Sequence, residues 1–263
     1  MRYRTNERSF DLHAPAHGVR TRYLIASSPR TGSNMLCRAL WLSGLAGAPD
    51  QYLNADHMLD FCQRENRPER TLVSYEFWQS MFWVNRIGIE EYLRFMENVR
   101  TTPNGVFGLR MHASNFFQDH LLNVSLREIL THFRIIRLVR QDYVAQAISF
   151  IVAAKHNAWI DDPEWHAGGS PSIDGHLKYD RQEIDRTAQY LAEMNRFFDT
   201  FFRDWPADIL TVQFEGLMGR YETEMRRVFD FIGTDQPAQV PTSNTRPQSS
   251  RLKDEWRARY ESE

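Results

Sequence analysis

Residues 23–35, Tyr-Leu-Ile-Ala-Ser-Ser-Pro-Arg-Thr-Gly-Ser-Asn-Met, predict a buried strand, a short loop and the start of a helix. The first four residues are apolar, Pro29 and Gly32 interrupt regular structure, and apolar residues from Leu36 onward recur at helical spacing. A helix that follows a strand and a glycine-containing loop directs free backbone N–H groups at an anion such as phosphate. A Gly-Ser turn also begins ordinary helices, so this stretch alone leaves a purely structural role open.

The loop differs from that of the nucleotide triphosphatases, which requires a lysine after its last glycine. Here Ser33 follows Gly32, and Arg30 is the only cation in the loop. The sequence therefore predicts a phosphate-bearing ligand that is held without the usual pair of lysine and magnesium.

Residues 133–150 give a second phosphate signal. Residues 133–139 predict another strand, Arg140 follows it, and Asp142 is a candidate N-cap for a helix that carries Ser149. Ligands bind at the carboxyl ends of strands in open parallel sheets, so Arg140 and Ser149 are candidates to meet a second phosphate. The alternative is that Arg140 pairs with Asp142 or Glu215 and that Ser149 lies on the helix surface.

Together these stretches resemble the P-loop-like sulfotransferases that use 3′-phosphoadenosine-5′-phosphosulfate (PAPS), most closely the bacterial trehalose sulfotransferase group. Five landmarks in order over about nine-tenths of the chain carry the resemblance: Ser-Pro-Arg-Thr-Gly-Ser (28–33), Gly-x-Pro (47–49), Thr-Pro-Asn-Gly-Val-Phe-Gly (102–108), Arg-Gln-Asp-x-Val-x-Gln-Ala-x-Ser-Phe (140–150) and Asp-Glu-Trp-x-x-x-Tyr (254–260). The implied fold is α/β, a three-layer P-loop-like arrangement with a central, mostly parallel sheet flanked by helices.

The resemblance also implies the residues that bind the co-substrate PAPS. The first loop would bind the 5′-phosphosulfate through Ser28, Pro29, Arg30, Thr31, Gly32, Ser33 and Asn34. Arg140 and Ser149 would bind the 3′-phosphate. The C-terminal segment 240–263 would fold over the nucleotide, with Arg246 or Arg251 reaching the 3′-phosphate; a solvated tail is the alternative.

Sulfuryl transfer to an alcohol needs a base, positive charge near the moving group and in-line placement. The trehalose sulfotransferase group has a glutamate base shortly after Gly-x-Pro, and here Gln51, which cannot accept a proton, stands at that position. Either Asp50, one residue away, replaces it as the base, or the base lies elsewhere in the chain. Other members of the superfamily use Lys-x-His at a strand end, and Arg110-Met111-His112 has that spacing. We expect His112 to be the base and Arg110 to act electrostatically; a histidine satisfied at a strand end is the alternative.

Composition agrees with one enzyme domain. The chain has 263 residues, of which 42% are hydrophobic and 25% charged, and its net charge is −2. These values favour a single α/β domain over residues 1–263, with an N-terminal arm at 1–21, and give no general attraction to nucleic acid or anionic lipid. No apolar signal segment or membrane span is present, so we expect a cytoplasmic protein. No His/Cys/Asp spacing indicates a metal site, and neither Cys37 nor Cys62 indicates a disulfide.

The remaining segments complete the α/β pattern. Helices are expected at 34–44, around 89–96, from Asp180 through Phe202 with Asp180 and Glu183 as a capping box, and before Gly233; strands are expected at 106–111 and 208–214. Aromatic residues of 56–86 would either line an acceptor site or form a core helix over 75–86. Residues 157–179 lack periodicity and predict a mobile lid.

The leading hypothesis is therefore a PAPS-dependent sulfotransferase that acts on a carbohydrate, a glycolipid or another small hydroxyl-bearing acceptor. Two alternatives stay open: a P-loop kinase-like phosphotransferase, and a catalytically inactive homologue that binds the nucleotide. The missing lysine and the lack of an evident magnesium-binding aspartate count against a kinase. The resemblance implies a homodimer as well, for which the residues themselves give no signal.

Overall fold

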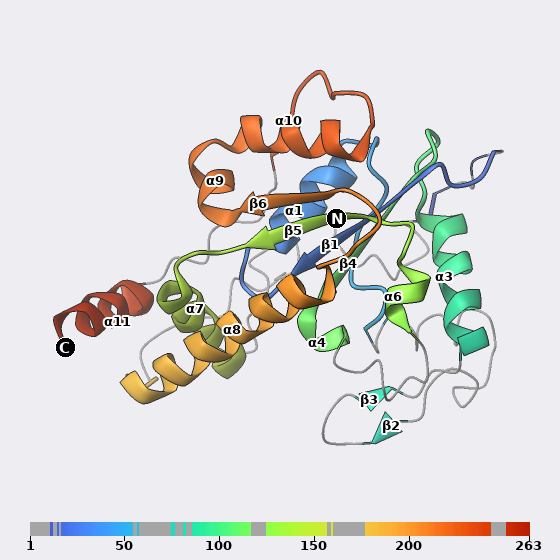
Figure 1. Cartoon of the computed structure of the whole chain (residues 1–263). Coiled ribbons are helices and arrows are strands. Elements are labelled where there is room, and N and C mark those ends of the chain that lie inside the picture. The colour runs from blue at the N-terminus through green and yellow to red at the C-terminus, as the bar shows by residue number, and fades with distance from the viewer. Residues whose placement is uncertain are drawn as a thin grey trace.

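The computed structural model describes residues 11, 12, 15, 17–54, 57, 75–76, 81–82, 86–116, 125–156, 159, 177–242 and 251–263. Its centre is a sheet of four strands: β1 (Thr21–Ser27), β4 (Val106–His112), β5 (Arg134–Val139) and β6 (Ile209–Gln213). The strand order is β4-β1-β5-β6, and all three pairings are parallel. Each strand lies within two residues of the range expected from the sequence, and the α/β prediction is confirmed (Figure 1).

The sheet register sets the position of the functional residues. β1 lies between β4 and β5, and Ser27 at its end pairs with His112 on one side and Leu138 on the other. The carboxyl ends of the three strands therefore meet at one edge of the sheet. The first loop, the Arg110–His112 segment and Arg140 all leave the sheet at this edge.

Helices cover both faces of the sheet, as Figure 1 shows. On one face, Tyr23, Ile25 and Ile136 pack in a cluster that includes residues of α1 (Ser33–Leu42), α9 (Phe214–Gly219) and α10 (Tyr221–Ile232). On the other face, Leu24 and Ile135 belong to a cluster formed with α3 (Arg86–Arg100), α6 (Leu126–Ile129), α7 (Tyr143–His156) and α8 (Arg181–Phe201). Alternate side chains of β1 and β5 enter opposite clusters, as strand geometry requires.

The helix ends follow local sequence signals. Asp142 Oδ1 accepts a hydrogen bond from Ala145 N at 2.9 Å at the start of α7, and Asp180 Oδ1 accepts one from Glu183 N at 3.0 Å at the start of α8. The Glu183 carboxylate of α8 pairs with Lys155 Nζ of α7 at 2.7 Å, and this ion pair links the two helices. Gly233 ends α10 with a φ of 80°, the left-handed conformation that glycine adopts at little cost.

Other segments depart from the expectations. A core helix over 75–86 is wrong: Tyr75–Glu76 (β2) and Met81–Phe82 (β3) form an antiparallel pair. A strand of two residues is stable only when it pairs with another strand. Its own sequence is too short to show the alternation that predicts a strand. The acceptor-site role of the aromatic residues around them stays a prediction, as does the 157–179 lid, most of which lies outside the described residues.

One short helix and a C-terminal helix complete the described elements. α4 (Ala113–Phe116) follows β4 directly, and α11 (Arg251–Ser262) packs against α7 with Trp256 buried. α11 is thus packed against α7, and the position of the C-terminal segment over a nucleotide stays a prediction. None of the described helices combines the length and the apolar character that a membrane span needs.

Candidate active site

The first loop is tightly folded after β1. Ser28 and Thr31 are fully buried, and Thr31 Oγ1 donates to Ser28 O at 3.0 Å. Arg30 has a φ of 65° and Gly32 a φ of 81°, so the chain turns twice through left-handed conformations. Arg30 is the only described residue other than glycine with a positive φ. This backbone conformation is unfavourable for a residue with a side chain, and such strained residues are common at binding sites.

Gly32 allows the loop to lie against the segment that follows β6. A Cβ at Gly32 would lie 2.9 Å from Cδ2 of Phe214, closer than real side chains approach. Gly32 is also the N-cap of α1, and no side chain caps that helix. The first backbone N–H groups of α1 consequently remain available to an anion.

α7 holds the loop from the other side. Gln146 Nε2 donates to Ser28 Oγ at 2.9 Å and to Pro29 O at 2.6 Å. Arg30 Nε donates to Ser149 Oγ at 3.1 Å. Ser149 is only 8% exposed, so it is not the surface serine of the alternative interpretation. The two sequence stretches are thus joined by direct hydrogen bonds.

Arg140 also lies beside the loop. Its Nη1 donates to Arg30 O at 3.2 Å, and its guanidinium lies 4.5 Å from the centroid of the Phe214 ring. The carboxylates named as alternative partners have other contacts: Glu215 Oε1 accepts the N–H groups of Gln141 and Asp142, and Asp142 pairs with Arg257. Arg140 Nε is buried and has no hydrogen-bond partner within the described part of the chain.

The charges at this position repel one another. Burial and the nearby Arg140 guanidinium lower the pKa of Arg30 to about 10. Burial lowers the pKa of Arg140 as well, with a further contribution from Arg257, although Asp142 and Glu215 act in the opposite direction. Two neighbouring guanidinium groups with lowered pKa values form a site where a bound anion would be stabilising.

A second cluster forms around the buried side chain of Arg110. Its Nη2 donates to Asp50 Oδ1 and to Gln51 Oε1, both at 3.0 Å. Its Nη1 donates to Ser33 Oγ at 3.4 Å and also to Asn34 Oδ1. Arg110 therefore connects the start of α1 with the 50–51 segment. Its Nε is buried without a partner in the described chain.

His112 lies at the end of β4 and is half-buried. Its Nδ1 lies 3.0 Å from Ser27 O and 3.1 Å from Ser27 Oγ. A carbonyl oxygen only accepts hydrogen bonds, so Nδ1 carries the proton and Nε2 keeps its lone pair. Burial and the positive charge of Arg110 lower the pKa of His112 to about 3, although Ser27 and Asp50 oppose the shift. His112 is neutral at physiological pH.

Of the two C-terminal arginines named from the sequence, the structure describes Arg251 alone. Arg246 lies outside the described residues. The Arg251 side chain is 92% exposed and pairs with Glu255 at 2.6 Å on its own helix. Arg257 instead reaches α7, where its Nη1 donates to Asp142 Oδ1 at 2.8 Å. Arg257 is therefore the described C-terminal arginine that approaches Arg140.

Four contributing residues were given other roles or none from the sequence, although Ser27 adjoins the predicted loop and Gln146 stands in the 140–150 landmark. Gln146 and Phe214 fix the loop, Ser27 fixes the tautomer of His112, and Arg257 links α11 to the site. Gln146 had a detectable signal, since it is an amide on an otherwise apolar part of the 143–156 helix. The others act through contacts between distant segments and carry no local signal. No group of three His, Cys, Asp or Glu side chains that could hold a metal occurs among the described residues.

Comparison with known proteins assigns the sequence to a family. The sequence model of one family, described as Stf0 sulphotransferase, matches residues 22–263. The sulfotransferase domain of the Synechococcus PCC 7002 olefin synthase is 20% identical, with 94% of this chain and 91% of that chain covered and a TM-score of 0.40. Sulfotransferase STF9 from Mycobacterium avium is 15% identical, with 93% and 68% covered and a TM-score of 0.44.

Comparison with curated proteins gives no match. The assignment thus rests on the family match, which includes the loop 28–34, the Arg110 cluster, α7 and α11. On this evidence the chain belongs to the Stf0 sulfotransferase family and is a sulfotransferase.

Proposed function

We propose that the protein transfers a sulfuryl group from PAPS to a hydroxyl of a carbohydrate, a glycolipid or another small acceptor. The observation that carries the proposal is the pair Arg30 and Arg140 beside Ser149 and the uncapped start of α1. These groups offer donors for two separate phosphates: backbone N–H groups for one, and the guanidinium groups with Ser149 for the other.

The residues present fit this co-substrate. Arg140 Nε is a buried donor without a partner in the described chain, and the loop at Gly32 is too close to Phe214 to accept a side chain. We assign the 5′-phosphosulfate to the loop 28–34 and the 3′-phosphate to Arg140 and Ser149. PAPS, when bound, supplies a sulfuryl group that is activated by attachment to a phosphate leaving group.

His112 is the proposed base. Its Nδ1 proton is held by Ser27 O, which leaves Nε2 free to accept a proton from an acceptor hydroxyl. The pKa of about 3, lowered mainly by burial and further by the charge of Arg110, makes this a weak base. An anion bound next to Arg110 would offset that charge and raise the pKa of His112. Asp50, the other candidate, already accepts from Arg110 and from Gln51 N, at 3.0 and 2.8 Å.

Arg110 has an electrostatic role in this proposal. The residue stays protonated, so it stabilises negative charge without giving up a proton. Its contacts to Ser33 and Asn34 place that charge at the start of α1, next to the proposed 5′-phosphosulfate site. Gln51 accepts from the same guanidinium and would position it.

One observation favours a second candidate, an inactive homologue that binds the nucleotide. Gln51 stands where the related group has its glutamate base, and Gln51 cannot accept a proton. The low pKa of His112 points in the same direction. Both candidates share the phosphate sites and differ only in turnover. A cytoplasmic location and a homodimer remain predictions of the sequence.

Isothermal titration with adenosine 3′,5′-bisphosphate, the desulfated product, tests the phosphate sites. We expect the bisphosphate to bind far more tightly than ATP with magnesium. Arg140→Gln should weaken bisphosphate binding by about tenfold or more, because a buried charge-assisted contact is lost. No binding, or a preference for magnesium ATP, would overturn the proposal.

Turnover with labelled PAPS and a panel of hydroxyl acceptors tests the base. We expect His112→Gln to lose most activity, on the order of 10²-fold or more, while it still binds the bisphosphate. Asp50→Asn is the comparison variant. Bisphosphate binding without any turnover across the panel would favour the inactive homologue.

A further inference from the structure

The outer side of β6 is an open sheet edge. The strand order makes β4 and β6 the two outermost strands. The outer side of β4 is partly covered, because Arg110 N donates to Asp50 O at 2.9 Å and Asp50 forms a bridge with Leu109. No strand of the described chain lies beyond β6.

Three residues of β6 present their backbone groups to this open side. Ile135 N donates to Asp208 O at 3.1 Å, and Ile135 is in register with Ile209. In a parallel ladder this pattern continues with Leu210 and Val212 bonded to β5. The N–H and C=O groups of Ile209 and Thr211 therefore point outward, and within the described chain they have no backbone partner. The N–H of Gln213 points the same way, whereas Gln213 is the N-cap of α9 and its C=O accepts the first hydrogen bond of that helix.

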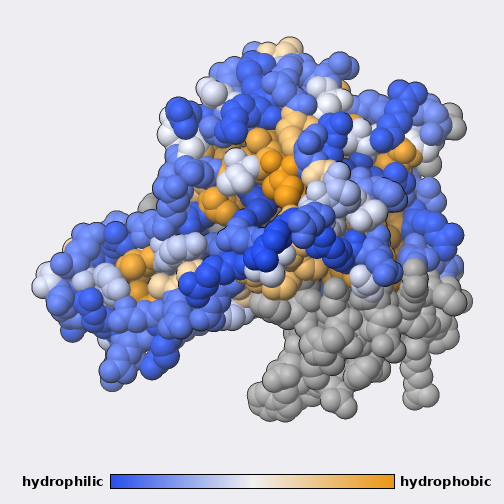
Figure 2. All heavy atoms as spheres, viewed as in Figure 1, coloured by the Kyte–Doolittle hydropathy of each residue, from blue (hydrophilic) through white to orange (hydrophobic). Residues whose placement is uncertain are grey.

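The edge lacks the features that usually prevent strand addition. Proteins protect open edges with charged residues, proline, bulges or a covering segment. β6 reads Ile-Leu-Thr-Val-Gln, without charge or proline, and its alternate residues Ile209, Thr211 and Gln213 are exposed. Figure 2 shows hydrophobic surface in the middle of the view, where Figure 1 places β6 between α10 and α8. Ile209 is 40% exposed.

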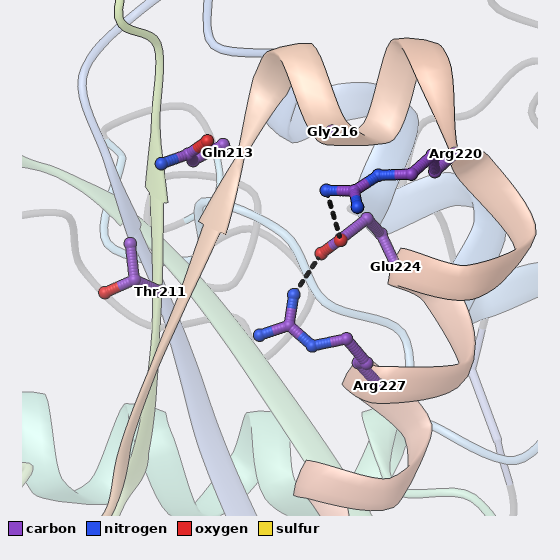
Figure 3. A pocket seen from close by; sticks show the side chains of 6 residues that line it. All are labelled: Thr211, Gln213, Gly216, Arg220, Glu224 and Arg227. Carbon is purple, nitrogen blue, oxygen red and sulfur yellow. Dashed lines mark hydrogen bonds and ion pairs between the residues drawn. The ribbon is translucent and has the colours of Figure 1, made fainter.

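A pocket of about 280 Å³ lies along this edge, lined by Thr211, Gln213, Gly216, Arg220, Glu224 and Arg227. Figure 3 shows both arginines directed at the Glu224 carboxylate beside the β6 ribbon. The Glu224 side chain is only 6% exposed, whereas those of Arg220 and Arg227 are 73% and 48% exposed. One buried carboxylate thus faces two accessible guanidinium groups, which gives the pocket a net positive charge.

We propose that the β6 edge and this pocket bind an extended acidic segment of a partner protein by strand addition. The outward backbone groups supply the hydrogen bonds, and the charge of the pocket selects acidic side chains. Leu210 and Val212 face the α10 side of the sheet, and Ile209 faces the other side. Because side chains of a strand alternate, the segment that fits has acidic residues on the α10 side and apolar residues beside Ile209.

Two probe peptides test the proposal on the full chain. One is a terminally capped peptide of alternating valine and glutamate; in the other, lysine replaces glutamate. We expect the glutamate peptide to bind, with amide shifts in β6, and the lysine peptide to bind about tenfold more weakly or not at all. Equal binding of the two peptides, or no binding of either, would overturn the proposal.

Two variants test the two parts of the surface separately. Thr211→Pro removes an outward N–H, a change that edge strands tolerate. It should abolish peptide binding and leave bisphosphate binding unchanged. Thr211→Val, which keeps the N–H, is its control. Arg220→Gln alters a mostly exposed side chain. It should weaken binding of the glutamate peptide about two- to fivefold, as expected for an exposed ion pair. Unchanged binding by both variants would contradict the assignment. So would sedimentation that finds a dimer of the unmodified chain but a monomer of Thr211→Pro, because β6 would then pair two copies of this chain.

Discussion

At the scale of single residues, Gly32 is a tightly constrained position of the loop 28–34. Alanine there would adopt an unfavourable left-handed conformation and bring a Cβ to 2.9 Å from the Phe214 ring. We expect Gly32→Ala to lower the free energy of unfolding by about 2–4 kcal/mol, as the sum of backbone strain and overpacking. Urea denaturation measures this loss.

Gly44→Ala is the matched control for that substitution. Gly44 also has a positive φ, 67°, but nothing lies within 4 Å of a Cβ built there. Its substitution should cost only the backbone strain, about 1–2 kcal/mol. Equal losses for the two variants would mean that contact with Phe214 does not constrain the loop.

His112 makes the stability of the protein depend on pH. Its pKa is about 3 in the folded state and near 6.5 in the unfolded chain. Between these values the unfolded chain binds a proton that the folded protein does not. The free energy of unfolding therefore falls as pH drops from about 6.5 toward 3, by up to about 1.4 kcal/mol per pH unit.

His112→Gln should reduce that slope, as measured by urea denaturation between pH 6.5 and 4.5. His132→Gln, which removes an exposed imidazole, is the control. A similar loss of slope in both variants would argue against burial of His112 as the cause.

At the scale of elements, the aspartate residues that cap α7 and α8 differ in their further contacts. Asp180 caps α8, whereas Asp142 caps α7 and also accepts a hydrogen bond from Arg257 of α11. Replacing either with alanine should cost about 1 kcal/mol of stability. Only Asp142→Ala should also speed hydrogen exchange in α11, because it removes a link between α11 and α7. Equal exchange of α11 in the two variants would refute that link.

At the scale of the whole molecule, a net charge of −2 gives no general attraction for anions. Binding of the bisphosphate must therefore depend on the local arginines. At 100 times its dissociation constant, a ligand specific for the folded state adds about 2.7 kcal/mol of stability. For a chain of this size we expect the melting temperature to rise by about 5–10 °C.

Differential scanning fluorimetry checks this expectation, with Arg140→Gln as the comparison variant. That variant should lose most of the rise at the same ligand concentration. A rise of the same size with ATP and magnesium would contradict the selectivity expected for two separate phosphate sites.

Much of the fold could be predicted because its signals are local. Four short apolar runs gave the four strands, Asp142 and Asp180 marked helix starts, and Gly233 marked a helix end. The candidate site was predictable in part for the same reason, since strand ends place Arg110, His112 and Arg140 at one edge of a parallel sheet.

The sequence by itself determined the α/β class, the loop between β1 and α1 and the side chains that leave the strand ends, because spacing and turn residues act over a few positions. The tertiary structure decided which side chains meet. Gln146 fixes the loop from α7, Arg110 joins Asp50 to the start of α1, and Arg257 approaches Arg140 from α11. It also decided the pKa of His112, because burial and the distance to a guanidinium depend on packing between segments that are far apart in the chain.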